Sequence, residues 1–329
     1  MSINIDNPLI WENEDSFKTA IVTNFVEYLE VLKLIRKNDN ELWFRGQPNA
    51  SYRLIPSALR YAYETENQYG ELVEPQTVSY NTKGNRVAYI NIENMINEFK
   101  ELTEGYFRIK PVNDLEWYFL AQHYGIPTTL LDWTTDPLVA LFFATTNNDS
   151  NNNTSIEEAI NDYKNNPFSE LGASIFVIDP GRINERLSPF FKGGNPDKPV
   201  DFPLDTYESY SIIEGYLGRN DKYLTPSCIK GTPIDKRICR QSGNFTVHGF
   251  NIWPIDFYSS IQKDIYKIFI PNVCVKEMKD MLYILDVSDE SIYGVFEIDS
   301  ISRGIREEHV GEFRKSIDKL KDKYYLKNS

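Results

Sequence analysis

The sequence predicts an α+β protein organised as a single large domain. Segments in which apolar residues recur at helical spacing are interleaved with short apolar runs typical of strands. Hydrophobic residues make up 41% of the 329 residues, which is a globular composition. The chain has no internal repeat, and no clear linker divides it. We therefore expect a sheet core flanked by helices, with an N-terminal helical segment over 1–39 and the main domain over 40–329.

Helical spacing and capping residues define the expected helices. Ser16 can cap the first helix, and Asp136 followed by Pro137 is a typical helix start. The expected helices cover 16–36, 92–107, 114–124, 138–144, 275–285 and 310–325.

Short apolar runs bounded by glycine or proline define the expected strands. They cover 41–46, 130–133, 173–178 and 265–270, and 232–248 contains strand-like segments around 241–245. Residues 63–84 are polar and poorly periodic, so we expect a loop or an insertion there. The polar run 147–154 and the Pro/Gly-rich run 193–203 also predict loops.

Composition excludes several classes of function. A net charge of −13 argues against a protein that tracks a nucleic-acid backbone. The three cysteines are dispersed, without the spacing of a zinc site, which predicts a reducing cytoplasm and no bound metal. No apolar run approaches the roughly 18 residues that a membrane helix needs, so we expect no membrane partner. The motifs of P-loop ATPases, Rossmann dehydrogenases, common zinc proteases and α/β-hydrolases are absent.

The segment 122–137 is the most informative part of the chain for function. It places His123, Asp132, Trp133 and Thr134 around one strand-to-helix junction. Helix starts expose backbone N–H groups that bind anions or carbonyl oxygens. The same residues also have plain structural roles, because a histidine can cap the end of a helix and Thr or Asp can cap its start. Both interpretations stay open from the residues alone.

Two further positions are candidates for ligand contacts. Arg45 lies at a strand end beside Gly46, where its planar guanidinium can bind a phosphate or carboxylate, or form an internal salt bridge. Gln241 lies before Gly243 and can direct its amide into a pocket. Alternatively, that segment is simply a bulged strand in which Gly243 allows close backbone approach.

Three blocks of residues resemble the FRG-domain family, which is named for its Phe-Arg-Gly tripeptide. The first is Phe44-Arg45-Gly46-Gln47, followed by 54–60. The second runs over 120–134 and continues through Pro137 and 140–144, and the third is 237–245. The resemblance supplies positions, and because the biochemical function of the family is poorly defined, the chemistry must be inferred from the site.

The order of the blocks is similar to that of ADP-ribosyltransferases. Those enzymes place an Arg or His on a first strand, a Ser, Thr or Tyr before a helix, and a Glu or Gln on a later strand. The counterparts here are Arg45, Thr134 and Gln241. The resemblance implies a mixed or antiparallel sheet and NAD as cofactor. No glutamate occupies the third position, so Asp132 or another acid would have to supply the negative charge.

Three hypotheses for the function follow. The first is an NAD-binding, ADP-ribosyltransferase-like enzyme, which suits a toxin or an antiphage-defence effector and which acts on a protein or nucleic-acid acceptor. Its expected catalytic residues are Asp132, Gln241 and His123, and its expected cofactor-binding residues are Arg45, Gly46, Gln47, Tyr124, Trp133, Thr134 and Phe245. The second is a non-catalytic ligand-binding module, and the third is a nuclease or another hydrolase.

The first hypothesis carries geometric expectations. Arg45, Asp132, Trp133 and Gln241 should line one cavity. Arg45 should pair with Asp132 or another acid, because an unpaired buried guanidinium is costly. His123 and Asp132 should lie within hydrogen-bonding reach, directly or through one water. Trp133 and Phe245 should form the walls around the base of the ligand.

Overall fold

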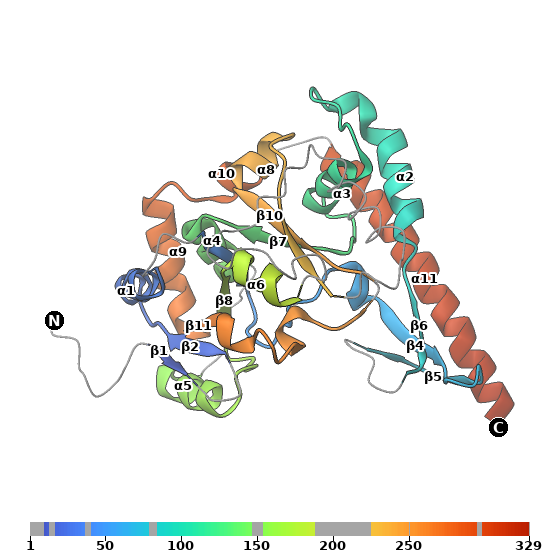
Figure 1. Ribbon diagram of the computed structural model, residues 1–329, viewed down its shortest axis with the longest axis horizontal. Helices are drawn as coiled ribbons and strands as arrows, with labels where there is room; N and C mark the ends of the chain where they lie inside the picture. Colours follow the sequence, from blue (N-terminus) through green and yellow to red (C-terminus); the bar gives the residue numbers. More distant parts are fainter. Residues whose placement is uncertain are drawn as a thin grey trace.

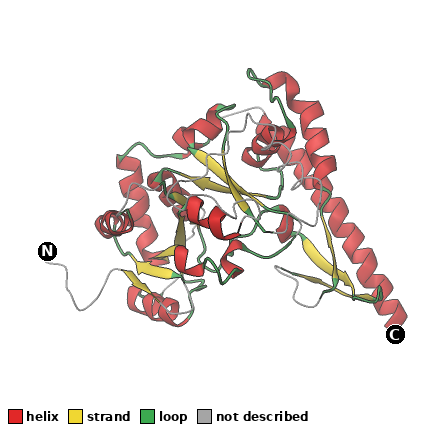
Figure 2. Ribbon diagram, viewed as in Figure 1, coloured by secondary structure: helices red, strands yellow, loops and turns green. Residues whose placement is uncertain are grey.

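The computed structural model describes residues 10–12, 17–36, 41–78, 84–146, 154–187, 225–249, 251–294 and 298–328. It is an α+β arrangement in which helices surround a central mixed sheet (Figures 1 and 2). A long C-terminal helix runs along one side, and a small second sheet lies beside its far end (Figure 1). The α+β class and the mixed sheet are therefore confirmed.

The central sheet has eight strands in the order β1-β2-β11-β8-β3-β7-β10-β9. They are β1 Ile10–Glu12, β2 Lys18–Ile21, β3 Trp43–Gln47, β7 Leu130–Thr134, β8 Gly172–Ile178, β9 Ser227–Lys230, β10 Gly243–Val247 and β11 Tyr266–Pro271. The β2–β11 pair is parallel and the other neighbouring pairs are antiparallel. Thus β3, β7 and β10, which carry the three sequence blocks, are neighbours in space.

The α-helices are α1 Phe25–Ile35, α2 Ile92–Thr103, α3 Asp114–His123, α4 Pro137–Thr145, α5 Ile156–Asn165, α6 Pro180–Leu187, α8 Lys236–Arg240, α9 Val275–Ile284, α10 Asp289–Ile292 and α11 Ile298–Asn328. Short 3₁₀ turns cover Ala58–Arg60, Glu104–Tyr106, Ile255–Phe257, Gln262–Asp264 and Asn272–Cys274. No helix in the described ranges combines the length and the apolar character that crossing a membrane requires.

The expected first helix over 16–36 is wrong in its first half. Residues Lys18–Ile21 form β2, which pairs with β11, and the helix begins only at Phe25. Asn24 caps it by accepting a hydrogen bond from the Glu27 backbone N–H. Pairing within the sheet has outweighed the apolar spacing that suggested an earlier start. Ser16, the predicted cap, lies outside the described residues.

The loop predicted over 63–84 is also wrong, because this region forms most of a three-stranded antiparallel sheet, whereas the alternative of an insertion stays a prediction. Its order is β5-β4-β6, with β4 Ala62–Glu66, β5 Leu72–Thr77 and β6 Arg86–Tyr89. The strands are polar because much of their surface is exposed. One contact to the long helix is that of the Tyr63 ring with Phe313 in α11. Such a sheet lacks the alternation that identifies a half-buried strand from sequence.

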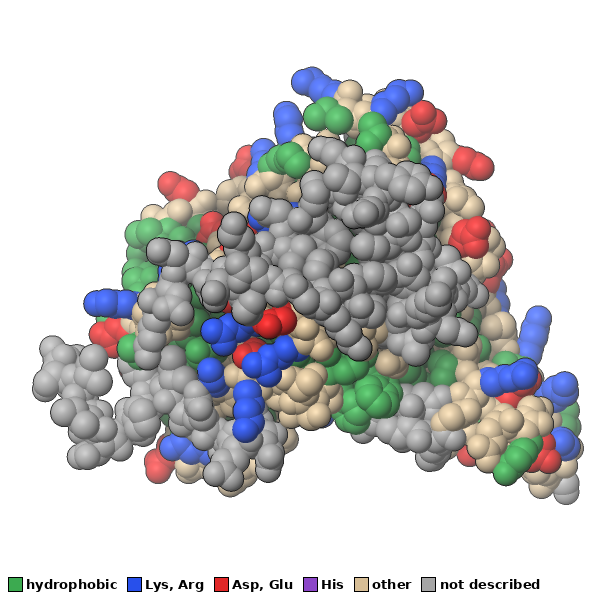
Figure 3. All heavy atoms as spheres, viewed as in Figure 1, with side chains coloured by type: hydrophobic (Ala, Val, Ile, Leu, Met, Phe, Trp, Pro, Cys, Tyr) green, Lys and Arg blue, Asp and Glu red, His purple; other side chains and the backbone are tan. Residues whose placement is uncertain are grey.

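Other differences are smaller. The final helix was predicted over 310–325, and α11 begins earlier and ends later, at Ile298 and Asn328. The loop predicted over 193–203, and all but the last residue of the loop predicted over 147–154, lie outside the described residues. On the described part of the face in Figure 3, acidic and basic side chains are interspersed with apolar ones.

Gly46 allows α4 to lie directly against β3. A Cβ atom at this position would overlap the backbone carbonyl oxygen of Ala140 and the backbone nitrogen of Ala144. The predicted start of α4 is confirmed, with Asp136 accepting from the Leu138 N–H and Pro137 in the first turn. Most residues of α4 are buried, so the helix is held firmly over the strand that carries Arg45.

Lys267 is a fully buried cation on β11, away from the cavity described below. Its Nζ donates to the backbone carbonyls of Ala50 at 2.7 Å and Pro167 at 2.6 Å. The rings of Phe168 and Phe176 lie 4.0 and 4.8 Å from it. Burial lowers the pKa of Lys267 to about 7, and Asp256 partly offsets this effect.

We predict that this pKa makes stability depend on pH. The folded pKa lies below the unfolded value of roughly 10.4, so between these two values the unfolded chain binds more protons. The free energy of unfolding should therefore rise from pH 7 to pH 9, by an amount on the order of 1–3 kcal/mol. Urea unfolding of wild type and Lys267→Met at both pH values tests this, because the contribution should be missing from the variant. An equal pH dependence in both proteins would show that Lys267 does not cause it.

Candidate functional site

A cavity of about 250 Å³ lies where β3, β7 and β10 meet the end of α3. Its lining residues are Phe44, Arg45, Gly46, Gln122, His123, Gly125, Asp132, Trp133, Thr134, Phe143, Arg237, Gln241, Gly243 and Tyr293. All three sequence blocks contribute to it. The expectation that Arg45, Asp132, Trp133 and Gln241 line one cavity is therefore confirmed.

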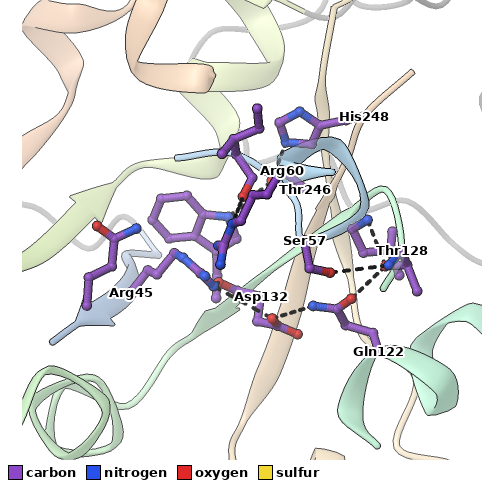
Figure 4. Close-up of polar contacts among 12 residues, drawn as sticks. Arg45, Ser57, Arg60, Gln122, Thr128, Asp132, Thr246 and His248 are labelled. Atoms are coloured by element: carbon purple, nitrogen blue, oxygen red, sulfur yellow. Dashed lines mark hydrogen bonds and ion pairs between the residues drawn. The ribbon is translucent and has the colours of Figure 1, made fainter. Parts of the chain in front are cut away.

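Arg45 reaches from β3 to β7 beside the short contact between these strands. The two strands share a single residue pair, Phe44 with Thr134, whereas β7 and β10 pair along their whole length. The Arg45 Nη1 donates to the Asp132 backbone carbonyl at 2.7 Å and lies 3.6 Å from its carboxylate (Figure 4). Burial lowers the pKa of Arg45 to about 10, which leaves it charged at neutral pH. The expected pairing of Arg45 with Asp132 is present.

Gln122 orients the carboxylate of Asp132 (Figure 4). Its Nε2 donates to Asp132 Oδ2 at 2.6 Å, and its Oε1 accepts from Thr128 Oγ1 at 2.6 Å. The Thr128 Oγ1 in turn accepts from the Leu130 N–H. The Asp132 side chain is still 38% exposed, so it is fixed in direction and open to a ligand.

The direct form of the expected contact between His123 and Asp132 is absent among the described residues, although both residues line the cavity. The side chain bound to Asp132 comes from its neighbour Gln122, and no hydrogen bond joins His123 to Asp132 within the described ranges. The His123 ring is buried, packs edge-on against Phe245, and has no hydrogen-bond partner for Nε2 among the described residues. Burial lowers the pKa of His123, with smaller opposing effects from Asp132 and Asp235. The imidazole is therefore mainly neutral at pH 7.

Glycine at position 243 leaves room for that imidazole. A Cβ there would lie 3.2 Å from His123 Nε2 and 3.3 Å from Cε1. Gln241 lies just before β10, in the turn that ends α8, so the alternative that places it in a bulged strand is wrong. Its amide nitrogen is 3.5 Å from the Ile292 carbonyl. Ser242 follows with a φ of 47°, a left-handed conformation that reverses the chain into β10.

Arg237 and Tyr293 are lining residues to which the sequence analysis assigned no role. The Arg237 Nη1 donates to Asp299 Oδ1 at 2.8 Å. Its guanidinium carbon lies 5.4 Å from the centre of the Tyr124 ring and 5.0 Å from that of Tyr293. The Tyr293 ring also packs edge-on against Phe143 at 5.9 Å. Arg237 appeared in the third sequence block, but Tyr293 lies far from all three blocks and no local pattern marks it.

Trp133 and Phe245 were expected to form walls around the base of the ligand, but neither ring faces the cavity. Trp133 packs in the cluster of Trp43 and Phe176 and donates from Nε1 to Thr246. Asp132 and Thr134 point to the other side of the sheet, because successive strand residues alternate. Phe245 is fully buried and stacks on Phe119, with ring centres 4.2 Å apart.

The remaining predicted residues have other positions. Gly46 and Thr134 line the cavity, and Thr134 Oγ1 accepts from the Asp136 N–H at the turn into α4. Gln47 and Tyr124 do not line it. Gln47 is buried and donates to the Arg53 carbonyl, while Tyr124 packs on Arg237. Across the described ranges, no group of three or more His, Cys, Asp or Glu side chains is placed to hold a metal ion.

Comparison with known families identifies the class of domain. The family model described as the FRG domain matches residues 40–153, so this chain contains an FRG domain. The match includes Arg45, Gln122, His123 and Asp132, whereas Arg237, Gln241 and Tyr293 come from later in the chain. The cavity is therefore completed by residues beyond the matched segment. Neither the curated proteins nor the solved structures gave a match to the chain.

Proposed function

We propose that the cavity binds NAD or a related nucleotide and that the protein is an ADP-ribosyltransferase-like, NAD-consuming enzyme. The observation that carries this proposal is the Asp132 carboxylate, held by Arg45 and Gln122 and open to a cavity that His123 and Gln241 also line. Such a site joins an anion-binding cation, an ionised acid and a neutral histidine. These are the groups that cleavage of a nucleotide glycosidic bond needs.

The size of the cavity indicates which part of the ligand it would hold. Pockets for small molecules have volumes of roughly 300–1,000 Å³, and this cavity is slightly smaller, at about 250 Å³. It therefore suits one ring with its ribose, and the rest of a dinucleotide would extend over the open side. That side is marked by the partly exposed Asp132 side chain.

The proposed reaction breaks the bond between the ribose C1′ and the nicotinamide nitrogen. Nicotinamide leaves with the bonding electron pair, and positive charge develops on the ribose. Asp132 stabilises that charge in place of the glutamate that is missing from the third block, and Gln241 is placed to bind a ribose hydroxyl. An acceptor group or water then forms the new bond to C1′, and neutral His123 takes its proton. Burial lowers the pKa of His123, which keeps the imidazole unprotonated and therefore available to accept a proton.

The proximity of the three blocks supports the likeness to ADP-ribosyltransferases. Arg45, Thr134 and Gln241 come from β3, from the end of β7 and from the turn into β10, and these strands are adjacent in the sheet. As part of the same proposal, the protein acts in the cytoplasm on a protein or nucleic-acid acceptor, as a toxin or an antiphage-defence effector would.

A non-catalytic binding module is the second candidate, and one observation favours it. The third position carries the neutral amide of Gln241, whose nitrogen is directed at the Ile292 carbonyl. An amide can hold a hydroxyl group but stabilises positive charge poorly. In such a module the same cavity would bind the nucleotide without cleaving it.

Incubation with NAD separates the two candidates. We expect release of free nicotinamide, detected by chromatography, and a mass increase of one ADP-ribose unit on an acceptor protein or nucleic acid. Release of nicotinamide without a mass increase would define a hydrolase of NAD. Tight calorimetric binding of NAD without any release would favour the binding module. The absence of both binding and release would contradict the proposal.

Arg45→Lys should weaken the binding of NAD by about 1.5–3 kcal/mol. Lysine keeps the positive charge but lacks the planar fork that pairs with an oxyanion and reaches Asp132. Calorimetric titration of both proteins measures the change, and Arg86→Lys is the matched control because Arg86 lies exposed on the small sheet. Equal affinities for Arg45→Lys and wild type would remove Arg45 from the binding site.

A further inference from the structure

We infer that Arg237 is a second anion-binding residue of the cavity and that, together with Arg45, it binds a phosphate-type oxyanion of the ligand. This inference deepens the proposed function and rests on it for the identity of the nucleotide. Arg237 lies outside the segment that matches the FRG domain, on the short helix α8.

The guanidinium of Arg237 is held in a fixed position. The rings of Tyr124 and Tyr293 flank it, and Asp299 at the start of α11 binds its Nη1 at 2.8 Å. The side chain is only 12% exposed. A cation fixed by two rings and one carboxylate loses little conformational entropy when a ligand binds.

Both arginines of the cavity retain an unpaired donor. The Nε atoms of Arg45 and Arg237 are buried and have no hydrogen-bond partner among the described residues. Each guanidinium donates a hydrogen bond from Nη1, to the Asp132 backbone carbonyl for Arg45 and to the Asp299 carboxylate for Arg237. Buried donors without partners are rare and costly in native proteins, and a bound group that accepts from them is one explanation for them. Here two of them belong to the lining of one cavity.

Charge and geometry favour an oxyanion as the group that completes them. Asp132 is the single carboxylate of the lining, since Asp299, which pairs with Arg237, does not line the cavity, and His123 is mainly neutral. The edge formed by Nε and Nη2 of a guanidinium matches two oxygens of a phosphate. Two arginines that line one cavity can together bind a phosphate or pyrophosphate. Phe143 and Tyr293 supply the partly exposed aromatic rings of the lining, so they would face the planar ring of the ligand.

The alternative is a purely structural role, in which Arg237 only ties α8 to α11 through Asp299. Substitutions on either side of this ion pair separate the two roles. Arg237→Lys keeps the charge but removes the fork, and Asp299→Asn removes the ion pair while the guanidinium remains. Arg240→Lys is the matched control, because Arg240 belongs to the same helix and does not line the cavity.

The test is calorimetric titration of these full-length proteins with inorganic pyrophosphate, NAD and nicotinamide riboside, which has no phosphate. We expect Arg237→Lys to bind pyrophosphate and NAD roughly 10- to 100-fold more weakly than wild type. Its affinity for nicotinamide riboside should not change. Arg240→Lys and Asp299→Asn should bind pyrophosphate within about threefold of wild type.

Three results would overturn the inference. The first is an absence of pyrophosphate binding by wild type, and the second is equal binding of pyrophosphate by wild type and Arg237→Lys. The third is a loss of pyrophosphate affinity in Asp299→Asn as large as that in Arg237→Lys, which would assign Arg237 a structural role. Failure of the proposed function looks different. If only the proposed function fails, pyrophosphate binding still depends on Arg237, but NAD is neither bound nor cleaved. The anion-binding site is then correct and the NAD chemistry is not.

Discussion

Asp132→Asn should slow the release of nicotinamide from NAD by roughly 10²- to 10³-fold. Asparagine has nearly the same shape, and the backbone carbonyl that binds Arg45 is kept, so the fold should be preserved. What is lost is the negative charge that the cavity directs at the developing positive charge of the ribose. Initial rates at saturating NAD measure the effect, and thermal unfolding of the variant checks the fold.

Asp136→Asn is the matched control for this substitution. Asp136 lies four residues further along the chain, caps α4 and does not line the cavity. Asparagine caps helices as well as aspartate does, so the rate should stay close to that of wild type. A rate for Asp132→Asn above about one third of the wild-type rate would contradict the role assigned to this carboxylate.

Gly46→Ala should destabilise the protein by about 3 kcal/mol, near the upper end for an added methyl group in a packed core. The new Cβ would overlap the Ala140 carbonyl oxygen and the Ala144 nitrogen. These atoms belong to the backbone of a buried helix and cannot rotate away. Either α4 or β3 must therefore move, and movement of β3 would also displace Arg45.

Urea unfolding of Gly46→Ala measures the loss, and Gly304→Ala provides a control of opposite sign. Gly304 lies inside α11, and a Cβ there meets nothing within 4 Å. Alanine at that position should stabilise the protein by up to about 1 kcal/mol, since glycine is a poor helix former. A change below about 0.5 kcal/mol in Gly46→Ala would contradict the tight contact between α4 and β3.

The strand-to-helix junction could be predicted from the sequence because its determinants are local. Asp136 and Pro137 specify the start of α4 through neighbouring backbone groups, and 130–133 is a short apolar run before it. The first helix could not be placed as well, since β2 depends on pairing with β11 from the far end of the chain. A distant partner leaves no signal in the local spacing of residues.

The site was predicted only in part, again because some of its contacts depend on the tertiary fold and leave no local signal. The blocks indicated which residues share a cavity, but not which side chain binds Asp132, because Gln122 and His123 are adjacent and the rotation of α3 decides between them. The direction of the Trp133 ring was predicted wrongly, because the expectation that it walls the ligand base ignored the alternation of side chains along a strand. Alternation along a strand places it on the side opposite to Asp132 and Thr134. Tyr293 could not be found, since only the tertiary fold brings it to the cavity.

The location of the ligand tests the central claim most directly. We suggest a crystal structure of Asp132→Asn soaked with NAD, since slow turnover keeps the nucleotide intact. The account predicts the nicotinamide ribose between residue 132 and Gln241, with phosphate oxygens bound by Arg45 and Arg237. Nucleotide bound at another surface, or a cavity without nucleotide at saturating NAD, would contradict it.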